Sequence, residues 1–167
     1  MPIALLTAAA FAASIVTCFA PEENCAGRAI SAVDAAQPEI LVNAYALTKG
    51  SGIPAALIRA HARGVDVRMV ADRHSPCDLQ EGVDALSAAG ILVGIGARAR
   101  VAHEKALIID RSVTIMGSYN WTKGAASNSE DLNVVTSPEV AEAYARHWQA
   151  RQAVSVPFAD ASQWCRR

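Results

Sequence analysis

The stretch EILVNAYALTKGSGIPAALIRAHARGVDVRMVA, residues 39–71, decides the fold. Its first part, 39–46, has a continuous apolar centre, which is typical of a strand covered on both faces of its sheet. After a Gly-Ser-Gly turn, residues 53–63 have helical composition and are followed by Gly64, a common helix terminator. Residues 65–71 again resemble a strand. A strand, a helix and a second strand in this order predict a parallel crossover unit.

The rest of the chain extends this unit into one α/β domain. Helices are expected at 27–36, 79–89 and 138–150, and strands at 91–94, 106–109, 112–116 and 131–136. A chain of 167 residues fits one domain with a substantial core. We therefore expect a mixed, mostly parallel sheet sandwiched by helices on both faces.

The N-terminus resembles an export signal. Residues 3–16 form an uncharged apolar run, shorter than the ~20 residues of a membrane span and suited to a signal-peptide core. No lysine or arginine precedes the run, so the basic part of a signal is missing. We predict a signal peptide at 1–17 and a single catalytic domain at 18–167. The mature protein is then periplasmic or secreted by a bacterium, without stable membrane insertion.

The four cysteines agree with export, because disulfides form in oxidising compartments. Four cysteines allow three connectivities, of which we favour Cys18–Cys25 with Cys77–Cys165. The stretch before Cys18 also resembles a lipoprotein cleavage box. Zinc is disfavoured, because no CxxC pair is present and the four histidines are scattered, so no metal site is expected.

The net charge and the local distribution of charge give opposite indications about a nucleic-acid substrate. The net charge of -1 and a pI of about 6.4 argue mildly against nucleic acid, whose phosphates are contacted by lysine and arginine. Placement of charge matters more than the total. One window has a local positive surplus, from Arg98, Arg100, Lys105, Arg111 and Lys123 against Glu104 and Asp110.

The chemistry-bearing segment is HEKALIID, which starts at His103, followed six residues later by GSYN. His103 and Lys105 are two residues apart, so on an extended segment both side chains project to one face. Asp110 ends the apolar run, where the chain turns. Ser118 and Asn120 follow the next expected strand and add a hydroxyl and an amide.

A phosphodiester requires this combination of groups. Phosphoryl transfer depends on positioning and on donors for the charged oxygens, which Lys105, Ser118 and Asn120 supply. A neutral imidazole nitrogen can attack phosphorus and form a covalent intermediate. A general acid must then protonate the departing oxygen from the opposite side, and histidine suits this task as well.

The segment resembles the HxKxxxxDxxxxxxGSxN signature of the phospholipase D superfamily and matches every fixed position. The downstream segment around Glu130, Tyr45 at the end of the first strand, and His147 in the last helix are similar to the small single-motif bacterial endonucleases of this group. The resemblance covers most of residues 25–151.

The resemblance implies a role for each matching residue. His103 is the expected nucleophile, and Glu130 is expected to hydrogen-bond a catalytic histidine. Lys105, Ser118 and Asn120 would bind the phosphate, whereas Asp110 would orient neighbouring groups. The expected catalytic set is His103, Lys105, Asp110, Ser118, Asn120 and Glu130. The family requires no metal, and we expect no cofactor.

Most members of the superfamily carry the motif twice, whereas this sequence carries it once. One copy of His103 cannot act as nucleophile and as opposing acid in the same step. A two-fold homodimer would supply both groups, because an isologous interface places identical residues on either side of its axis.

Residues around the motif have two readings each. Arg73 and His74 follow a strand's end, the usual ligand side of such sheets, so they line the substrate groove or belong to a plain loop. Trp121 follows the motif and lines the groove or covers the core. We count Arg73 and Trp121 among the candidate substrate contacts. Glu104 points away from His103 by alternation and is expected to be non-catalytic.

The sequence therefore predicts a metal-independent, non-specific endonuclease acting on DNA or RNA. One alternative is a phospholipase D-type hydrolase of lipid headgroups, which would need a lipid-binding surface that the sequence does not display. Another is an accessory protein that binds nucleic acid without turnover, which the intact motif disfavours.

Overall fold

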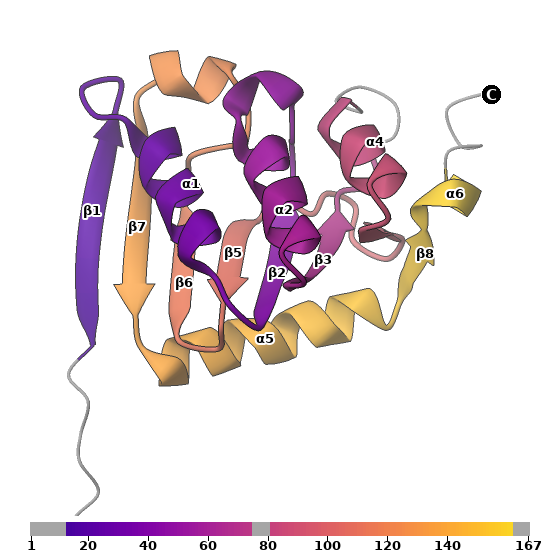
Figure 1. Ribbon diagram of the computed structural model, residues 1–167. Coiled ribbons are helices and arrows are strands. Elements are labelled where there is room, and N and C mark those ends of the chain that lie inside the picture. Colours follow the sequence, from indigo (N-terminus) through magenta and orange to yellow (C-terminus); the bar gives the residue numbers. More distant parts are fainter. Residues whose placement is uncertain (1–12, 75–80, 162–167) are drawn as a thin grey trace, which may run out of the picture.

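The computed structural model describes residues 13–74 and 81–161 and shows one sheet with helices on both faces (Figure 1). The eight strands lie in the order β1-β7-β6-β5-β2-β3-β4-β8. Their bounds are β1 Ser14–Ala20, β2 Glu39–Ala44, β3 Asp66–Ala71, β4 Leu92–Gly96, β5 Lys105–Ile109, β6 Val113–Gly117, β7 Glu130–Thr136 and β8 Ser155–Pro157. The expected α/β sandwich is confirmed.

The sheet is mixed, but antiparallel pairs outnumber parallel ones. β2 pairs in parallel with β3, and β3 with β4, which confirms the predicted crossover unit. The other five pairs of neighbouring strands are antiparallel. The expectation of a mostly parallel sheet was wrong, because the β5–β6 hairpin, β7 and β1 extend the sheet by antiparallel pairing.

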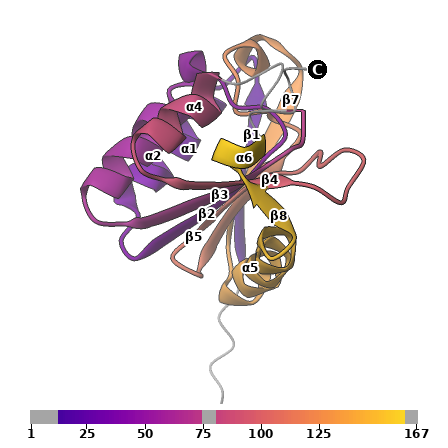
Figure 2. The ribbon, with the colours of Figure 1, turned by 90° about the vertical axis from the view of Figure 1, so that its right-hand side faces the viewer.

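The helices form two layers of unequal size (Figure 2). Helices α1, α2 and α4 cover one face of the sheet, and α5 alone lies across the other face. The bounds are α1 Cys25–Ala35, α2 Ile53–Ala62, α4 Glu81–Ala88, α5 Pro138–Gln152 and α6 Phe158–Ala161, with short 3-10 turns η1 Lys49–Ser51 and η2 Gly124–Ser127.

Two apolar clusters hold these layers to the sheet. Successive residues of β2 alternate between them: Ile40 and Val42 belong to the larger cluster, and Leu41 belongs to the cluster with α5. Trp148 of α5 is buried in the second cluster, and its indole N–H donates to the Val42 carbonyl at 2.9 Å. This double covering explains the continuous apolar run in β2.

Strand β1 is an edge strand that the sequence did not predict. It runs antiparallel to β7, with Ser14 opposite Thr136 and Ala20 opposite Glu130. A disulfide between Cys18 and Cys25 joins β1 to the first residue of α1, which confirms this half of the favoured pairing. Cys77 and Cys165 lie outside the described residues.

The strand begins inside the range expected for a signal peptide. Residues 14–17 pair with β7, so a cut after residue 17 would remove the first half of β1. The signal peptide and its boundary at 17 stay a prediction. Within residues 13–74 and 81–161, no helix is both long and apolar enough to cross a membrane.

Candidate active site

The site is built around Lys105, the first residue of β5. Because β5 runs antiparallel to β2, Lys105 lies opposite Ala44, at the end of β2. The Lys105 side chain is buried, and its ammonium lies 2.7 Å from Nδ1 of His103 and donates to the His103 carbonyl oxygen at 2.5 Å. The structure therefore brings the expected imidazole and ammonium into direct contact.

Tyr45 forms one wall around these two groups. Its ring lies 4.4 Å from the His103 ring, measured between centroids, and the Lys105 ammonium lies 5.1 Å from the Tyr45 centroid. An ammonium over an aromatic face is attracted by the electrons of the ring. Tyr45 follows β2 directly, and this position after a strand at the ligand side was the signal that could have assigned it to the site.

The charge of Lys105 is only partly compensated. Burial lowers the pKa of Lys105 below its usual value, and the Glu130 carboxylate opposes this shift by its charge. Burial also raises the pKa of Tyr119, with the same carboxylate contributing. A buried ammonium favours an anionic ligand, because a second negative charge replaces the stabilisation by water that the ammonium loses on burial.

Ser118 and Glu130 meet at the ends of β6 and β7. The Ser118 hydroxyl donates to a Glu130 carboxylate oxygen at 2.5 Å and accepts from the Asp131 N–H at 3.0 Å. Gly117 precedes them, and a Cβ atom there would lie 2.3 Å from the Asp131 carbonyl oxygen. Glycine at this position therefore lets β6 and β7 approach closely enough for the serine to reach the carboxylate.

Asn120 carries an unpaired polar atom at the site. Its Oδ1 is buried and makes no hydrogen bond within the described part of the chain. A cavity of about 360 Å³ opens beside His103 and Lys105, and Met116 and Asn133 are among its other lining residues. The expected site residues His103, Lys105, Ser118, Asn120 and Glu130 thus lie at one end of the sheet.

Trp121 is a core residue, which corrects its assignment as a substrate contact. Its side chain is fully buried, and the indole N–H donates to the Asn43 carbonyl oxygen at 3.1 Å. Burial in the core removes more of the apolar indole from water than an open groove would, so of the two expected roles Trp121 has that of covering the core. Arg73 is exposed after β3, in keeping with either of its two readings.

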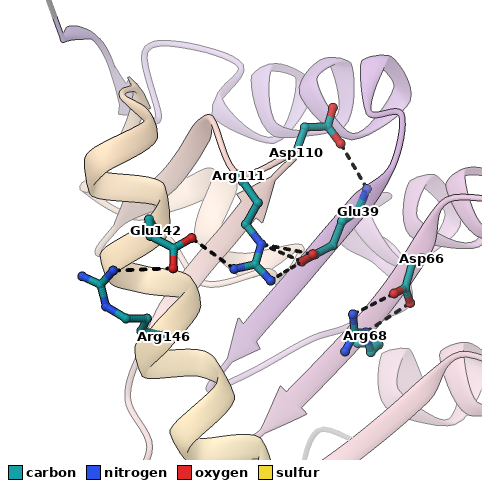
Figure 3. Close-up of polar contacts among 7 residues, drawn as sticks. All are labelled: Glu39, Asp66, Arg68, Asp110, Arg111, Glu142 and Arg146. Atoms are coloured by element: carbon teal, nitrogen blue, oxygen red, sulfur yellow. Dashed lines mark hydrogen bonds and ion pairs between the residues drawn. The ribbon is translucent and has the colours of Figure 1, made fainter. Parts of the chain in front are cut away.

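Asp110 lies at the opposite end of β5, which corrects its assignment to the catalytic set. Four residues of extended chain lie between it and Lys105, so the two are five steps apart, a span of about 16 Å. Its carboxylate accepts from the N–H groups of Gln37 and Glu39 at 3.1 to 3.2 Å. Figure 3 shows the Asp110 carboxylate at the backbone N–H of Glu39. The side-chain carboxylate of Glu39 forms an ion pair with Arg111. Asp110 therefore ties the β5–β6 turn to the start of β2.

Glu104 faces away from the His103–Lys105 contact, as expected. Its carboxylate accepts from His147 at 2.8 Å and from Arg151 at 2.5 Å, both on α5. Hydrogen bonds from these residues outweigh the effect of burial and hold the pKa of Glu104 below its usual value. Within residues 13–74 and 81–161, no group of three or more His, Cys, Asp or Glu side chains could hold a metal ion.

Comparison with known proteins agrees with this geometry. A family model described as cardiolipin synthase, PLD-like domain matches residues 29–151. This chain belongs to the PLD-like domain family. It is therefore a hydrolase of the phospholipase D superfamily with phosphodiester-cleaving chemistry, as the resemblance of the motif indicated.

Relatives of the PLD-like chain include proteins with different names. A phospholipase D of Rickettsia bellii is 36% identical over 140 residues, 83% of this chain and 69% of that protein. A mitochondrial cardiolipin hydrolase of Chlamydomonas reinhardtii is 32% identical over 85 residues, 50% of this chain and 38% of that protein. Nuc, a phospholipase D family member of Salmonella typhimurium, aligns with a TM-score of 0.80 at 30% identity, over 87% of this chain and 98% of Nuc.

We expect Asp110→Ala to lower stability and to leave turnover per folded molecule within about threefold of wild type. The substitution leaves two backbone N–H groups without their acceptor and puts alanine at a φ of 52°, so unfolding should become easier by about 1–3 kcal/mol. Asp110→Asn keeps an acceptor and tolerates this φ, and serves as the matched control. Loss of turnover in a stable Asn variant would return Asp110 to the catalytic set.

Glu130→Gln should shift the alkaline limb of kcat/KM to lower pH. The Glu130 charge raises the pKa of Lys105, so its removal lets burial lower that pKa further, and the ammonium is lost earlier as pH rises. Ser118→Ala removes the hydrogen bond to Glu130 but keeps the carboxylate, so its alkaline limb should stay in place. An alkaline limb that stays in place in Glu130→Gln as well would show that Glu130 does not support the Lys105 charge.

Proposed function

We propose that this chain is a metal-independent, non-specific endonuclease that cleaves DNA or RNA. The observation that carries the proposal is the contact of the buried Lys105 with the exposed His103 beside an exposed, cationic loop. That loop contains Arg98 and Arg100, both exposed, and Arg98 shares a cavity of about 240 Å³ with His103. Of the wider positive window, Arg111 is engaged by Glu39 and Glu142 at the far end of the sheet and contributes nothing here.

Size supports a nuclease as well. The chain and Nuc match over nearly the whole of Nuc, so both have the same minimal domain around the site. A small domain with an open, cationic rim can contact a polymer by its phosphates without reading its bases. Such contacts give little sequence preference.

The groups of the site are sufficient for a two-step hydrolysis. A neutral His103 nitrogen attacks phosphorus; the N–P bond forms as the P–O bond to the leaving group breaks, and that oxygen takes a proton from an opposing imidazolium. Water then attacks the phosphohistidine: its oxygen bonds to phosphorus as the N–P bond breaks and releases neutral His103, and the water gives its proton to the same opposing imidazole, which becomes an imidazolium again. Lys105 and Asn120 stabilise the phosphate oxygens in both steps, and the Ser118 hydroxyl does so by exchanging Glu130 for a phosphate oxygen as its acceptor.

The opposing imidazole comes from a second copy of the chain. One His103 cannot stand on both sides of phosphorus, and a two-fold axis through the site supplies its copy. The active unit is then a homodimer with one shared site. Export to the periplasm or the medium remains part of the proposal, because the Cys18–Cys25 disulfide suits an oxidising compartment.

A lipid substrate is the second candidate, and one observation favours it. Ile15 and Phe19 of β1 are exposed on the same face of the strand, and Phe19 lies opposite Asp131, next to Glu130 of the site. An apolar strip near the site would suit a membrane surface. The names of the Rickettsia and Chlamydomonas relatives point the same way, whereas the cationic rim favours nucleic acid.

The purified protein should nick plasmid DNA in excess chelator and release no choline from phosphatidylcholine vesicles. His103→Ala should reduce nicking on the order of 10⁴-fold, because it removes the nucleophile. His61→Ala, a histidine on α2 away from the motif, is the control. Choline release without nicking would establish the lipid hydrolase, and inactivity on both substrates in a folded dimer would establish an accessory binding protein.

Mixed dimers test the shared site. If wild-type and His103→Ala chains are combined at equal ratio and allowed to pair at random, activity should fall to about one quarter of the all-wild-type value. Independent sites would keep about one half. Light scattering must show a dimer, and an active monomer would end the shared-site mechanism.

A further inference from the structure

Asp72, at the end of β3, is a buried carboxylate that the hydrolysis described above does not use. Its side chain is almost completely enclosed. One oxygen accepts from the His74 N–H at 2.9 Å and lies 2.7 Å from Nδ1 of the His74 ring. The other oxygen accepts from the Ala102 N–H at 2.5 Å. A single carboxylate therefore joins the segment after β3 to the segment just before His103.

The bond to Ala102 fixes the backbone just before His103. The segment between β4 and β5 has no helix or strand of its own, so it depends on such contacts for its shape. A second anchor lies just after His103, where the Tyr45 N–H donates to the Glu104 carbonyl oxygen at 3.0 Å. His103 is thus held between two fixed points, and Asp72 supplies the first of them.

The bond to His74 orients an imidazole toward the same end of the sheet. Because a carboxylate accepts, Nδ1 of His74 carries a hydrogen, and Nε2 points away from Asp72 on the other side of the ring. The side chain is 55% exposed, and Nε2 makes no hydrogen bond to any of residues 13–74 and 81–161. The two bonds to one carboxylate keep Nδ1 of His74 and the Ala102 nitrogen within about 7 Å of each other.

We infer that Asp72 is a positioning residue for His103 and that the His74 imidazolium, which donates from Nδ1 to Asp72, donates from Nε2 to the phosphate next to the scissile one on a nucleic-acid strand. The second part rests on the proposed nuclease function. A polymer presents a regular series of phosphates, so a group beside the catalytic centre meets the neighbouring phosphate once the scissile one is bound.

The electrostatics of Asp72 agree with a fixed role. Burial by itself would raise the pKa of Asp72, but hydrogen bonds from Ala102 and His74 outweigh this and hold that pKa below its usual value. The carboxylate is therefore ionised and accepts from both segments over the working pH range. An asparagine cannot replace it, because its amide has one oxygen for partners on two sides.

Three substrates separate the two roles. Bis(p-nitrophenyl) phosphate and the dinucleotide TpT have one phosphodiester and no neighbouring phosphate, whereas an octathymidylate has several. His74→Ala should lower the preference for octathymidylate over TpT, measured as the ratio of kcat/KM values, by about fivefold through KM. The dependence of log KM on log salt for octathymidylate should also weaken by about 0.7, the value for one phosphate contact on a single strand. His61→Ala should keep the wild-type preference.

Asp72→Ala should lower kcat on all three substrates by about tenfold or more, because His103 loses an anchor. Asp72→Asn should lower it in the same direction, and this variant serves if the alanine variant does not fold. Thermal unfolding must show that the variant compared is folded at the assay temperature. Full turnover in a folded Asp72 variant would overturn the positioning role.

The outcomes for His74 are equally decisive. An unchanged preference in His74→Ala overturns the neighbouring-phosphate contact, and so does an equal loss of kcat on all three substrates, which would place His74 in the chemical step. A wild-type protein that cleaves bis(p-nitrophenyl) phosphate but neither nucleotide substrate contradicts the nuclease function and with it the His74 contact. The Asp72 role is still tested by the small diester in that case.

Discussion

The antiparallel pairing of β5 with β2 is the constraint on which the rest of the site depends. Lys105 lies opposite Ala44 and Ile109 lies opposite Ile40, so β5 begins where β2 ends. The start of β5 therefore meets the loops that follow β2 and β3, the side where open α/β sheets bind ligands. The same register sends Asp110 to the far end, where it binds the backbone ahead of β2.

The central charge of the site is the Lys105 ammonium, which is only partly neutralised. Burial lowers the pKa of Lys105, and the negative charge of Glu130 counteracts this effect. Glu130 is itself held by Ser118, so the negative charge stays at a fixed place. A phosphate entering between Lys105 and Ser118 would add the charge that the ammonium lacks. This arrangement explains why an anionic substrate suits the pocket whether the rest of that substrate is a nucleic acid or a lipid.

Local pattern was enough to predict the crossover unit and the His103–Lys105 contact, because both depend on short-range periodicity. Tertiary context decided the rest. Trp121 follows the motif directly, yet its indole belongs to the core, and a motif position cannot tell which side of a turn faces inward. Asp72 lies thirty residues from the backbone that it binds, so no local signal links it to His103. Strand β1 was hidden because an apolar run suits an export signal and an edge strand equally well.

Strand β1 also connects the N-terminus to catalysis. Ala20 of β1 lies opposite Glu130, whereas the pairing of β6 with β7 ends at Gly117 opposite Leu132, so β1 is the strand that pairs with β7 at Glu130. The Cys18–Cys25 disulfide fastens β1 to α1, and α1 packs on the core beneath the sheet. Covalent attachment of an edge strand restricts its fraying, and the strand in turn keeps the position of Glu130 relative to Ser118 and Lys105. The disulfide thus stabilises the charge balance of the site from its periphery, and a cut that shortened β1 would loosen the same carboxylate.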